Sequence, residues 1–332
     1  MKTMLSGLKP SGQLTLGNYI GALREFVKYQ DEYSLYIFIA NLHCITVPQD
    51  PKELQKNLRD SAALYLACGM DPEKITLFLQ SDVKAHAQLG YILSCYCYLG
   101  ELNRMTQYKD RVRKEKDHTQ SLTSGFYSYP TLMASDILIY DADYVPVGED
   151  QRQHVELARD IANRFNNRYG PTFTVPECLA PKVGARIMSL SDPTKKMSKS
   201  DIDGDKGCIY LLDEPEIAHK KIMSAKTDSY NKIAFDPEKQ PGVANLLSIL
   251  SSLSGKPIED LVKNFAESNY GTFKAAVADE VVKVLNTIQE KYNNIINTNL
   301  MEEVFIKGSK KAEVAANAKL KEVQKKIGLE IF

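Results

Sequence analysis

The chain has 332 residues, of which 43% are hydrophobic and 25% are charged, and this composition predicts a folded globular protein. Lysine plus arginine and aspartate plus glutamate each number 42, so any contact with nucleic acid must depend on local basic clusters. The N-terminus reaches Gly7 before an apolar signal segment develops, and no apolar run approaches the roughly 20 residues of a membrane span. We therefore expect a cytoplasmic protein. The six cysteines form no Cys-x-x-Cys pair, which favours free buried thiols over a metal site.

The first part of the chain alternates between strand patterns and helical patterns. Apolar, β-rich runs predict strands at residues 3–8, 33–42 and 75–80. Helices are predicted at 18–30 and 51–68, the second with Asp50 as its N-cap and Gly69 at its end. Strands and helices that alternate at this spacing predict parallel βαβ units in a doubly wound, Rossmann-like α/β sheet.

The rest of the chain is less regular and then becomes helical. Residues 107–120 carry charges of both signs. This pattern fits an exposed loop or helix end, and it also fits a basic arm that contacts phosphates. A strand pattern at 144–147 is followed by a helix with apolar positions through residue 165. After residue 207 the helical period predicts a second domain of roughly 85 residues, and then a long final helix that ends at Phe332.

Two motifs far apart in the sequence carry groups that suit a polyphosphate. In residues 10–18, Gly17 stands where a turn becomes a helix, so a phosphate can approach the backbone N–H groups there. Residues 195–200 supply lysine amines and serine hydroxyls. A capped turn explains the first motif alone, and a solvated loop explains the second. Because they follow the first and the last strands of one sheet, together they favour a ligand held from two sides at the topological switch point.

Both motifs resemble the signatures of the class I aminoacyl-tRNA synthetases. Lys196-Met197-Ser198-Lys199-Ser200 matches the second signature of that family without change. Thr15-Leu16-Gly17-Asn18 stands in place of the first signature, His-Ile-Gly-His, in the form that the bacterial-type tryptophanyl branch has. Further matches to that branch lie at residues 100–107, 129–136, 145–151, 154–166 and 181–188.

The resemblance implies a fold and an activity. It implies a Rossmann-like catalytic domain over 1–207 with an inserted dimerisation segment at roughly 81–140, a helical anticodon-binding domain over 208–292, and C-terminal helices over 293–332 that pack back toward the catalytic domain. The implied activity joins L-tryptophan to ATP as tryptophanyl-adenylate, releases pyrophosphate, and transfers the tryptophan to tRNA-Trp. A homodimer is implied. Mg²⁺ would bind with the phosphates of ATP and not in a cage of protein ligands.

The resemblance also implies the residues of each subsite. Lys196 and Lys199 would stabilise the leaving pyrophosphate, where charge accumulates, with Ser198, Thr15 and Asn18 in the same catalytic group. The residues implied for ATP are Lys9, Pro10, Ser11, Gly17, Asn18, Gly148, Glu149, Asp150, Ile187, Lys196, Met197, Ser198, Lys199 and Ser200. The residues implied for tryptophan are Leu5, His43, Tyr129, Met133, Asp136, Val145, Val147 and Gln151.

Asp136 is the residue that we expect to read the substrate side chain. A carboxylate only accepts hydrogen bonds and an indole N–H only donates them, so the two groups match. His43 ends a predicted strand, where it is either a core histidine or part of the amino-acid site. Two departures from the family are Leu5, which stands where an aromatic residue is frequent, and a charged segment after Gln107 that is longer than usual.

Two other functions stay open at this point. A tyrosyl-tRNA synthetase would also direct a phenol toward a carboxylate, but a phenolic oxygen needs a donor as well, and the matches at 130–136 and 159–162 favour tryptophan. A regulator that binds tryptophan or tRNA without catalysis is disfavoured by the intact phosphate-binding residues, such as Gly17 and Lys196.

Overall fold

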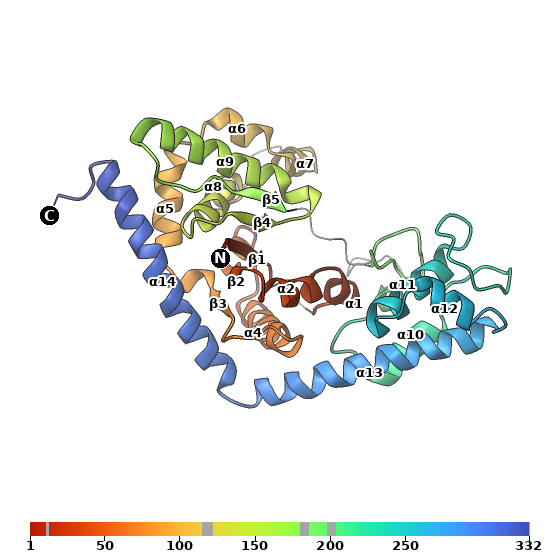
Figure 1. The fold of residues 1–332 in the computed structure, drawn as a ribbon. Helices are drawn as coiled ribbons and strands as arrows, with labels where there is room; N and C mark the ends of the chain where they lie inside the picture. The colour runs from red at the N-terminus through yellow and green to blue at the C-terminus, as the bar shows by residue number, and fades with distance from the viewer. Residues whose placement is uncertain (11–12, 115–121, 180–185, 198–203, 332) are drawn as a thin grey trace.

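The computed structural model describes residues 1–332 except 11–12, 115–121, 180–185, 198–203 and 332 (Figure 1). In the described part a parallel sheet of five strands forms the centre, in the order β3-β2-β1-β4-β5. The strands are β1 (Thr3–Leu8), β2 (Ser34–Ile39), β3 (Ile75–Leu79), β4 (Tyr144–Pro146) and β5 (Glu177–Leu179). The predicted doubly wound α/β fold is therefore confirmed, since the chain adds strands first on one side of β1 and then on the other.

The strands form because their apolar side chains can be buried on both faces of the sheet. Successive residues point to opposite faces, so Met4 and Ile37 enter one core cluster while Leu5 and Phe38 enter the other. β1 pairs with β2 along its whole length, and the predicted strand at 33–42 ends earlier, at Ile39. Asn41–Cys44 forms the short helix α3 instead, so the prediction that His43 ends a strand was wrong.

Helices cover one face of the sheet through local signals that are readable in the sequence. A continuous helical run begins as α1 (Leu16–Asn18), passes through the π-helical segment η1 (Tyr19–Leu23) and ends as α2 (Arg24–Tyr29). The helix α4 (Pro51–Ala67) begins as predicted, because the Asp50 side chain accepts a hydrogen bond from the backbone N–H of Glu53 at 2.9 Å. It ends before Gly69, whose φ of +105° favours glycine.

The helices of the middle segment pack on the opposite face of the sheet. α5 packs on α8, and α8 packs on α9 (Figure 1). The residues of 107–114 lie in a helix, α7, that buries none of its side chains, and the rest of that charged segment lies outside the described residues. The elements of this part are η2 (Gln80–Asp82), α5 (Ala85–Ser94), α6 (Leu99–Arg104), α7 (Thr106–Lys114), α8 (Ser124–Leu138) and α9 (Glu149–Tyr169).

The last part of the chain is helical, as predicted. Its elements are η3 (Gly204–Gly207), α10 (Pro215–Met223), α11 (Pro241–Ser254), α12 (Ile258–Asn264), α13 (Tyr270–Ile296) and α14 (Leu300–Lys326). α13 packs on α10 and α11 and reaches back to α4, where Tyr292 donates a hydrogen bond to Asp60 at 2.9 Å. α14 lies against β3 and α5, the arrangement that Figure 1 shows in blue.

Two details of this part differ from the sequence expectations. α13 continues through residue 292, where a domain boundary is predicted, and the division into domains stays a prediction. The final helix ends at Lys326 and does not reach Phe332, because Gly328 adopts a φ of +79° and its N–H bonds back to Lys325.

Two further sequence expectations concern thiols and membrane spans. All six cysteines lie in the described part and are free, but Cys95 is exposed, so they are not all buried as expected. Within the described ranges no helix combines the length and the apolar character needed to cross a bilayer.

The contact between α14 and β3 gives a test of the fold. A Cβ atom at Gly308 would lie 1.9 Å from the carbonyl oxygen of Leu77, so Gly308→Ala must push α14 away from the strand. We expect a loss of about 1–3 kcal/mol in the free energy of unfolding, measured by denaturant titration. Gly100→Ala in α6, where an added Cβ would meet nothing within 4 Å, is the matched control and is expected to be neutral or stabilising. An equal response of both variants would contradict this packing.

Candidate active site

One edge of the sheet holds part of the predicted site. β1 lies between β2 and β4, and the chain reverses its direction of growth at this point. In a parallel sheet all strands end at the same edge, and ligands bind there beside the switch point. Lys9 and Pro10 follow β1, Val147 and Gly148 follow β4, and Gln80 follows β3.

The first signature forms a capped helix start directly after β1. The Thr15 hydroxyl accepts a hydrogen bond from the Asn18 backbone N–H at 3.1 Å. The Asn18 amide oxygen in turn accepts from the Thr15 backbone N–H and hydroxyl, both at 3.0 Å. This reciprocal capping box fixes both side chains, and it uses the carbonyl end of the Asn18 amide while its NH₂ group takes no part in it.

The second signature begins on a turn whose two ends are hydrogen-bonded to each other. Met188 and Lys196 form an antiparallel bridge, and the N–H of Met197 donates to the carbonyl of Ile187 at 3.0 Å. Lys196 is exposed, whereas Lys195 pairs with Asp192 at 2.8 Å. The sequence predictions for Ser198, Lys199 and Ser200 fall outside the described residues, as does the prediction for Ser11.

An asparagine of the helical part holds this turn in place. The Asn245 side chain, on α11, accepts from the Met188 N–H at 2.8 Å and donates to the Met188 carbonyl at 2.9 Å. Asn245 is buried, so both hydrogen bonds are shielded from water. The position of α11 is thereby linked to the position of the lysine turn.

The two signatures meet in space. A Cβ atom built on Gly17 would lie 3.5 Å from the Met197 Cβ and 3.7 Å from the Ile187 Cβ, which is ordinary van der Waals contact. Ile187 and Met197 are both buried in the core cluster that also holds Leu16. The fold therefore brings together the two motifs that the sequence separates by about 180 residues, with Asn18 and Lys196 both exposed beside this contact.

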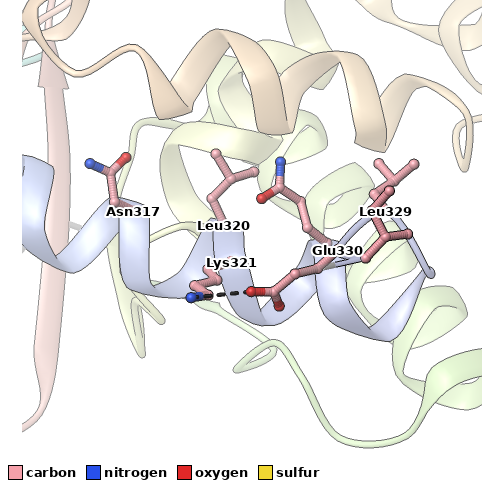
Figure 2. A pocket seen from close by; sticks show the side chains of 7 residues that line it. Asn317, Leu320, Lys321, Leu329 and Glu330 are labelled. Atoms are coloured by element: carbon pink, nitrogen blue, oxygen red, sulfur yellow. Dashed lines mark ion pairs between the residues drawn. The ribbon is translucent and has the colours of Figure 1, made fainter.

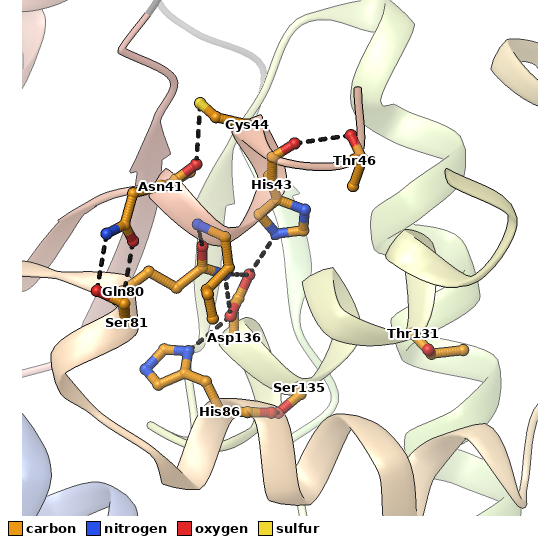
Figure 3. Close-up of polar contacts among 12 residues, drawn as sticks. Asn41, His43, Cys44, Thr46, Gln80, Ser81, His86, Thr131, Ser135 and Asp136 are labelled. Atoms are coloured by element: carbon orange, nitrogen blue, oxygen red, sulfur yellow. Dashed lines mark hydrogen bonds and ion pairs between the residues drawn. The ribbon is translucent and has the colours of Figure 1, made fainter. Parts of the chain in front are cut away.

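A second polar centre surrounds Asp136, which lies on α8 and is fully buried (Figure 3). Its Oδ2 is 2.8 Å from the His43 Nε2, and its Oδ1 is 2.6 Å from the His86 Nδ1. The Gln80 Nε2 lies 2.9 Å from both carboxylate oxygens. The partners come from α3, η2 and α5, so three separate elements converge on one carboxylate.

These hydrogen bonds decide the charge of Asp136. Burial by itself raises the pKa of this carboxyl group, but the hydrogen bonds from His43 and His86 outweigh burial and lower the pKa to about 2. Asp136 is therefore ionised at neutral pH and acts only as an acceptor. Of its three partners, His43 is the partly exposed one, with 16% of its side chain accessible.

Tyr129 lies beside Asp136 and its hydrogen-bond partners. Its ring meets the His43 ring edge-on at a centroid distance of 6.0 Å. Its hydroxyl lies 2.6 Å from the Gln107 Oε1 and 2.7 Å from the His154 Nε2. Burial, followed by the nearby His43, lowers the pKa of His154 to about 4, so His154 is neutral at pH 7.

The remaining predicted residues divide into buried and exposed groups. Leu5 and Val145 are buried in the core cluster that contains the Asp136 helix, and Met133 and Val147 pack against it. Gln151 is half-buried and donates to the Asp150 carboxylate at 3.0 Å. Lys9, Gly148 and Asp150 are exposed, and Pro10 is buried. The Glu149 side chain lies outside the described set.

Sequence reasoning missed the residues that support Asp136 and Tyr129. Gln80 follows the apolar run of β3, and a polar side chain at that end of a buried strand was a usable signal. His86 lies on α5 without a periodic or motif signal, so only its tertiary contacts identify it. Gln107 and His154 lie within the matched segments 100–107 and 154–166, but the resemblance gave them no role.

Two cavities lie apart from these residues. Figure 2 shows one at the end of α14, where Lys321 and Glu330 form an ion pair at 3.1 Å. The other is lined by Cys95, Tyr96, Tyr98, Arg164, Asn167 and Arg168. Among the described residues no group of three or more histidine, cysteine, aspartate or glutamate side chains is placed to hold a metal ion.

The chain is similar to known proteins over nearly its whole length. A family model described as tRNA synthetases class I (W and Y) matches residues 1–286. The tryptophan–tRNA ligase of Bacillus anthracis is 51% identical over 329 residues, which cover 99% of this chain and 98% of the relative.

Solved structures agree with this relationship. The tryptophanyl-tRNA synthetase from Mycoplasma pneumoniae superposes with a TM-score of 0.86 at 39% identity, covering 99% of this chain and 98% of that one. The tryptophanyl-tRNA synthetase from Campylobacter jejuni, complexed with ADP and tryptophan, has a TM-score of 0.83 at 36% identity and covers 99% and 100%. The chain therefore belongs to the class I tRNA synthetases for tryptophan and tyrosine, within the family of bacterial tryptophan–tRNA ligases.

Proposed function

We propose that the chain activates tryptophan with ATP held between the two signatures, and that it then passes the tryptophan to tRNA-Trp. The observation that carries this proposal is the closeness of Gly17 to Met197 and Ile187, since both motifs then lie together beyond the carboxyl end of β1. The Campylobacter jejuni relative, whose structure holds ADP and tryptophan, supports the same pair of ligands here.

In this proposal ATP lies along the first helix start and the lysine turn. Backbone N–H groups at Gly17 and the Asn18 amide NH₂ face the phosphates, and the helical run from Leu16 to Tyr29 adds its positive end. Mg²⁺ enters with the phosphates, because it keeps phosphate oxygens and waters as ligands. The residues assigned to ATP are Lys9, Pro10, Ser11, Gly17, Asn18, Gly148, Glu149, Asp150, Ile187, Lys196, Met197, Ser198, Lys199 and Ser200.

The first step is an in-line displacement at the α-phosphorus of ATP. A carboxylate oxygen of tryptophan forms the new P–O bond, while the bond to the β-phosphate oxygen breaks and pyrophosphate leaves. Negative charge grows on the departing group, so Lys196 and Lys199 stabilise the transition state more than the bound substrates. In the second step a ribose hydroxyl at the tRNA 3′ end attacks the carbonyl carbon of the adenylate, and AMP leaves.

We assign the indole ring to the side of Asp136 that His43 and Tyr129 border. Gln80 and His86 are buried, so the indole N–H shares or replaces the hydrogen bond of the partly exposed His43 on Oδ2. A tyrosine phenol would also reach the carboxylate, but its oxygen would then lack the donor that it requires. The residues assigned to tryptophan are Leu5, His43, Tyr129, Met133, Asp136, Val145, Val147 and Gln151.

For tRNA we propose the helical part, residues 208–292, as the anticodon-binding domain. Lys220, Lys226 and Lys232 are exposed there and can contact phosphates. Lys221, which follows Lys220 in the sequence, is buried and pairs with Asp213 at 2.9 Å. We therefore assign Lys221 to the stability of the fold and not to tRNA binding. Because its substrate would be the tRNA pool that supplies ribosomes, we place the protein in the cytoplasm.

A second copy of the chain is the proposed partner of α5 and α6. Tyr91 near the end of α5 and Tyr98 and Leu99 at the start of α6 are each more than 60% exposed. Large apolar side chains grouped on a surface mark interaction sites. The segment that contains them is the one for which the family resemblance implies dimerisation.

Exchange of pyrophosphate into ATP tests the function directly. We expect exchange that depends on tryptophan, and charging of tRNA-Trp in the same preparation, because the first step is reversible. The chain has no tryptophan, so bound substrate is the sole indole fluorophore in a binding titration. Equal exchange with tyrosine would overturn the assignment of the substrate.

Removal of the lysine charge tests the role of the second signature. Lys196→Ala is expected to lower kcat for exchange about 10²-fold, since one stabilising group of the transition state is lost. Lys195→Ala on the same turn, whose amine pairs with Asp192, is the matched control and should leave kcat within a few fold. A rise in the tryptophan KM with unchanged kcat for Lys196→Ala would contradict a transition-state role.

Sedimentation analysis tests the dimer. We expect the wild-type chain to sediment as a dimer at micromolar concentration, and Tyr91→Glu to shift it toward the monomer because a charge would be buried in the interface. Ile306→Glu, at a similarly exposed position on α14, is the control and should not change the mass. A monomeric wild-type chain would exclude this interface.

A further inference from the structure

The hydrogen bonds around Asp136 continue into the protein interior, away from the open side at His43. His86, on α5, is fully buried, and its second ring nitrogen, Nε2, lies 2.7 Å from the hydroxyl of Tyr140. Tyr140 follows the end of α8 and is also buried. The sequence motifs and the assigned ligand contacts leave both residues without a role.

The direction of these hydrogen bonds follows from the chemistry of the groups. An ionised carboxylate accepts only, so His86 donates Nδ1–H to Oδ1. With a single proton, on Nδ1, the ring has a lone pair on Nε2, and the Tyr140 hydroxyl donates to it. Every proton in the row Tyr140–His86–Asp136 therefore points toward the carboxylate.

Neighbouring contacts hold both members of the row in place. The His86 carbonyl accepts a hydrogen bond from the Ser135 hydroxyl at 2.7 Å, which ties α5 to α8 (Figure 3). The Tyr140 ring stacks on Tyr36 at a centroid distance of 4.6 Å and meets Phe78 edge-on at 5.7 Å. Gln80 is oriented separately, because its Oε1 accepts from the Leu42 N–H at 3.1 Å.

We propose that His86 and Tyr140 are positioning residues for tryptophan selection: Tyr140 fixes the Nδ1–H tautomer of His86, and His86 holds Asp136 as an ionised acceptor aimed at the indole N–H. This inference rests on the role of Asp136 in the proposed function. In the other tautomer, Nδ1 would turn a lone pair toward the carboxylate, which is tolerated only when Asp136 carries a proton. The proton would then lie on Oδ1 toward His86, and Oδ2 would be an uncharged and weaker acceptor for the indole N–H.

Four variants test the inference by the split between KM and kcat in pyrophosphate exchange. Tyr140→Phe and His86→Leu are expected to raise the KM for tryptophan about tenfold, because a buried hydrogen bond to the row is lost, with the KM for ATP unchanged. His86→Asn should keep the tryptophan KM within about threefold of wild type, since its amide N–H takes the place of Nδ1–H. Tyr292→Phe is the matched control, because it removes a tyrosine–aspartate hydrogen bond between α4 and α13.

A spectroscopic readout separates positioning from general stability. With five histidines in the chain, ¹⁵N-histidine spectra can assign the His86 tautomer, which we expect as Nδ1–H in the wild type and altered in Tyr140→Phe. Tyr140→Phe keeps the shape of the side chain, so it remains informative if His86→Leu fails to fold.

The outcomes separate this inference from the proposed function. If Asp136→Asn leaves the tryptophan KM unchanged, the assignment of Asp136 to the substrate is wrong and the inference falls with it. If Asp136→Asn raises that KM while Tyr140→Phe behaves like Tyr292→Phe, the inference alone is overturned. The inference alone is also overturned if His86→Asn loses as much tryptophan affinity as His86→Leu.

Discussion

A carboxylate can stay ionised inside a protein only when donors replace the water that it has lost. Asp136 meets this condition through His43, Gln80 and His86. Its donors arrive from α3, η2 and α5, so the ends of β2 and β3 and the packing of α5 on α8 must all be correct at once. The arrangement of the proposed amino-acid side of the site depends on this one constraint.

The phosphate side of the proposed site depends on how the two signatures are held together. A Cβ atom on Gly17 would lie at ordinary van der Waals distance from Met197 and Ile187, so the second signature packs beside the start of the first helix. Asn245 fixes Met188 from α11, and the lysine turn is consequently attached to the helical part of the chain as well as to the sheet. A movement of the helical part would therefore be transmitted to Lys196, because both hydrogen bonds are made to the backbone of Met188, its bridge partner.

Much of the fold was predictable because its signals are local. Apolar runs predicted the strands, Asp50 and Pro51 predicted the start of α4, and the glycine at 69 predicted its end. Errors arose where a local pattern had two solutions. Ala40 and Leu42 extend the apolar pattern past Ile39, so the sequence pattern did not separate the short helix that carries His43 from the strand.

The phosphate motifs were readable from the sequence alone, and the resemblance that they carry indicated the family and predicted Asp136 as the acceptor for the substrate. The groups that keep Asp136 charged became visible only in the folded structure, since His86, Gln80 and Tyr140 come from separate segments and share no periodicity with it. It also decided that Gly17 and Met197 are neighbours. A hydrogen bond between distant segments depends on how the elements pack against one another, and no single segment of the chain specifies that packing.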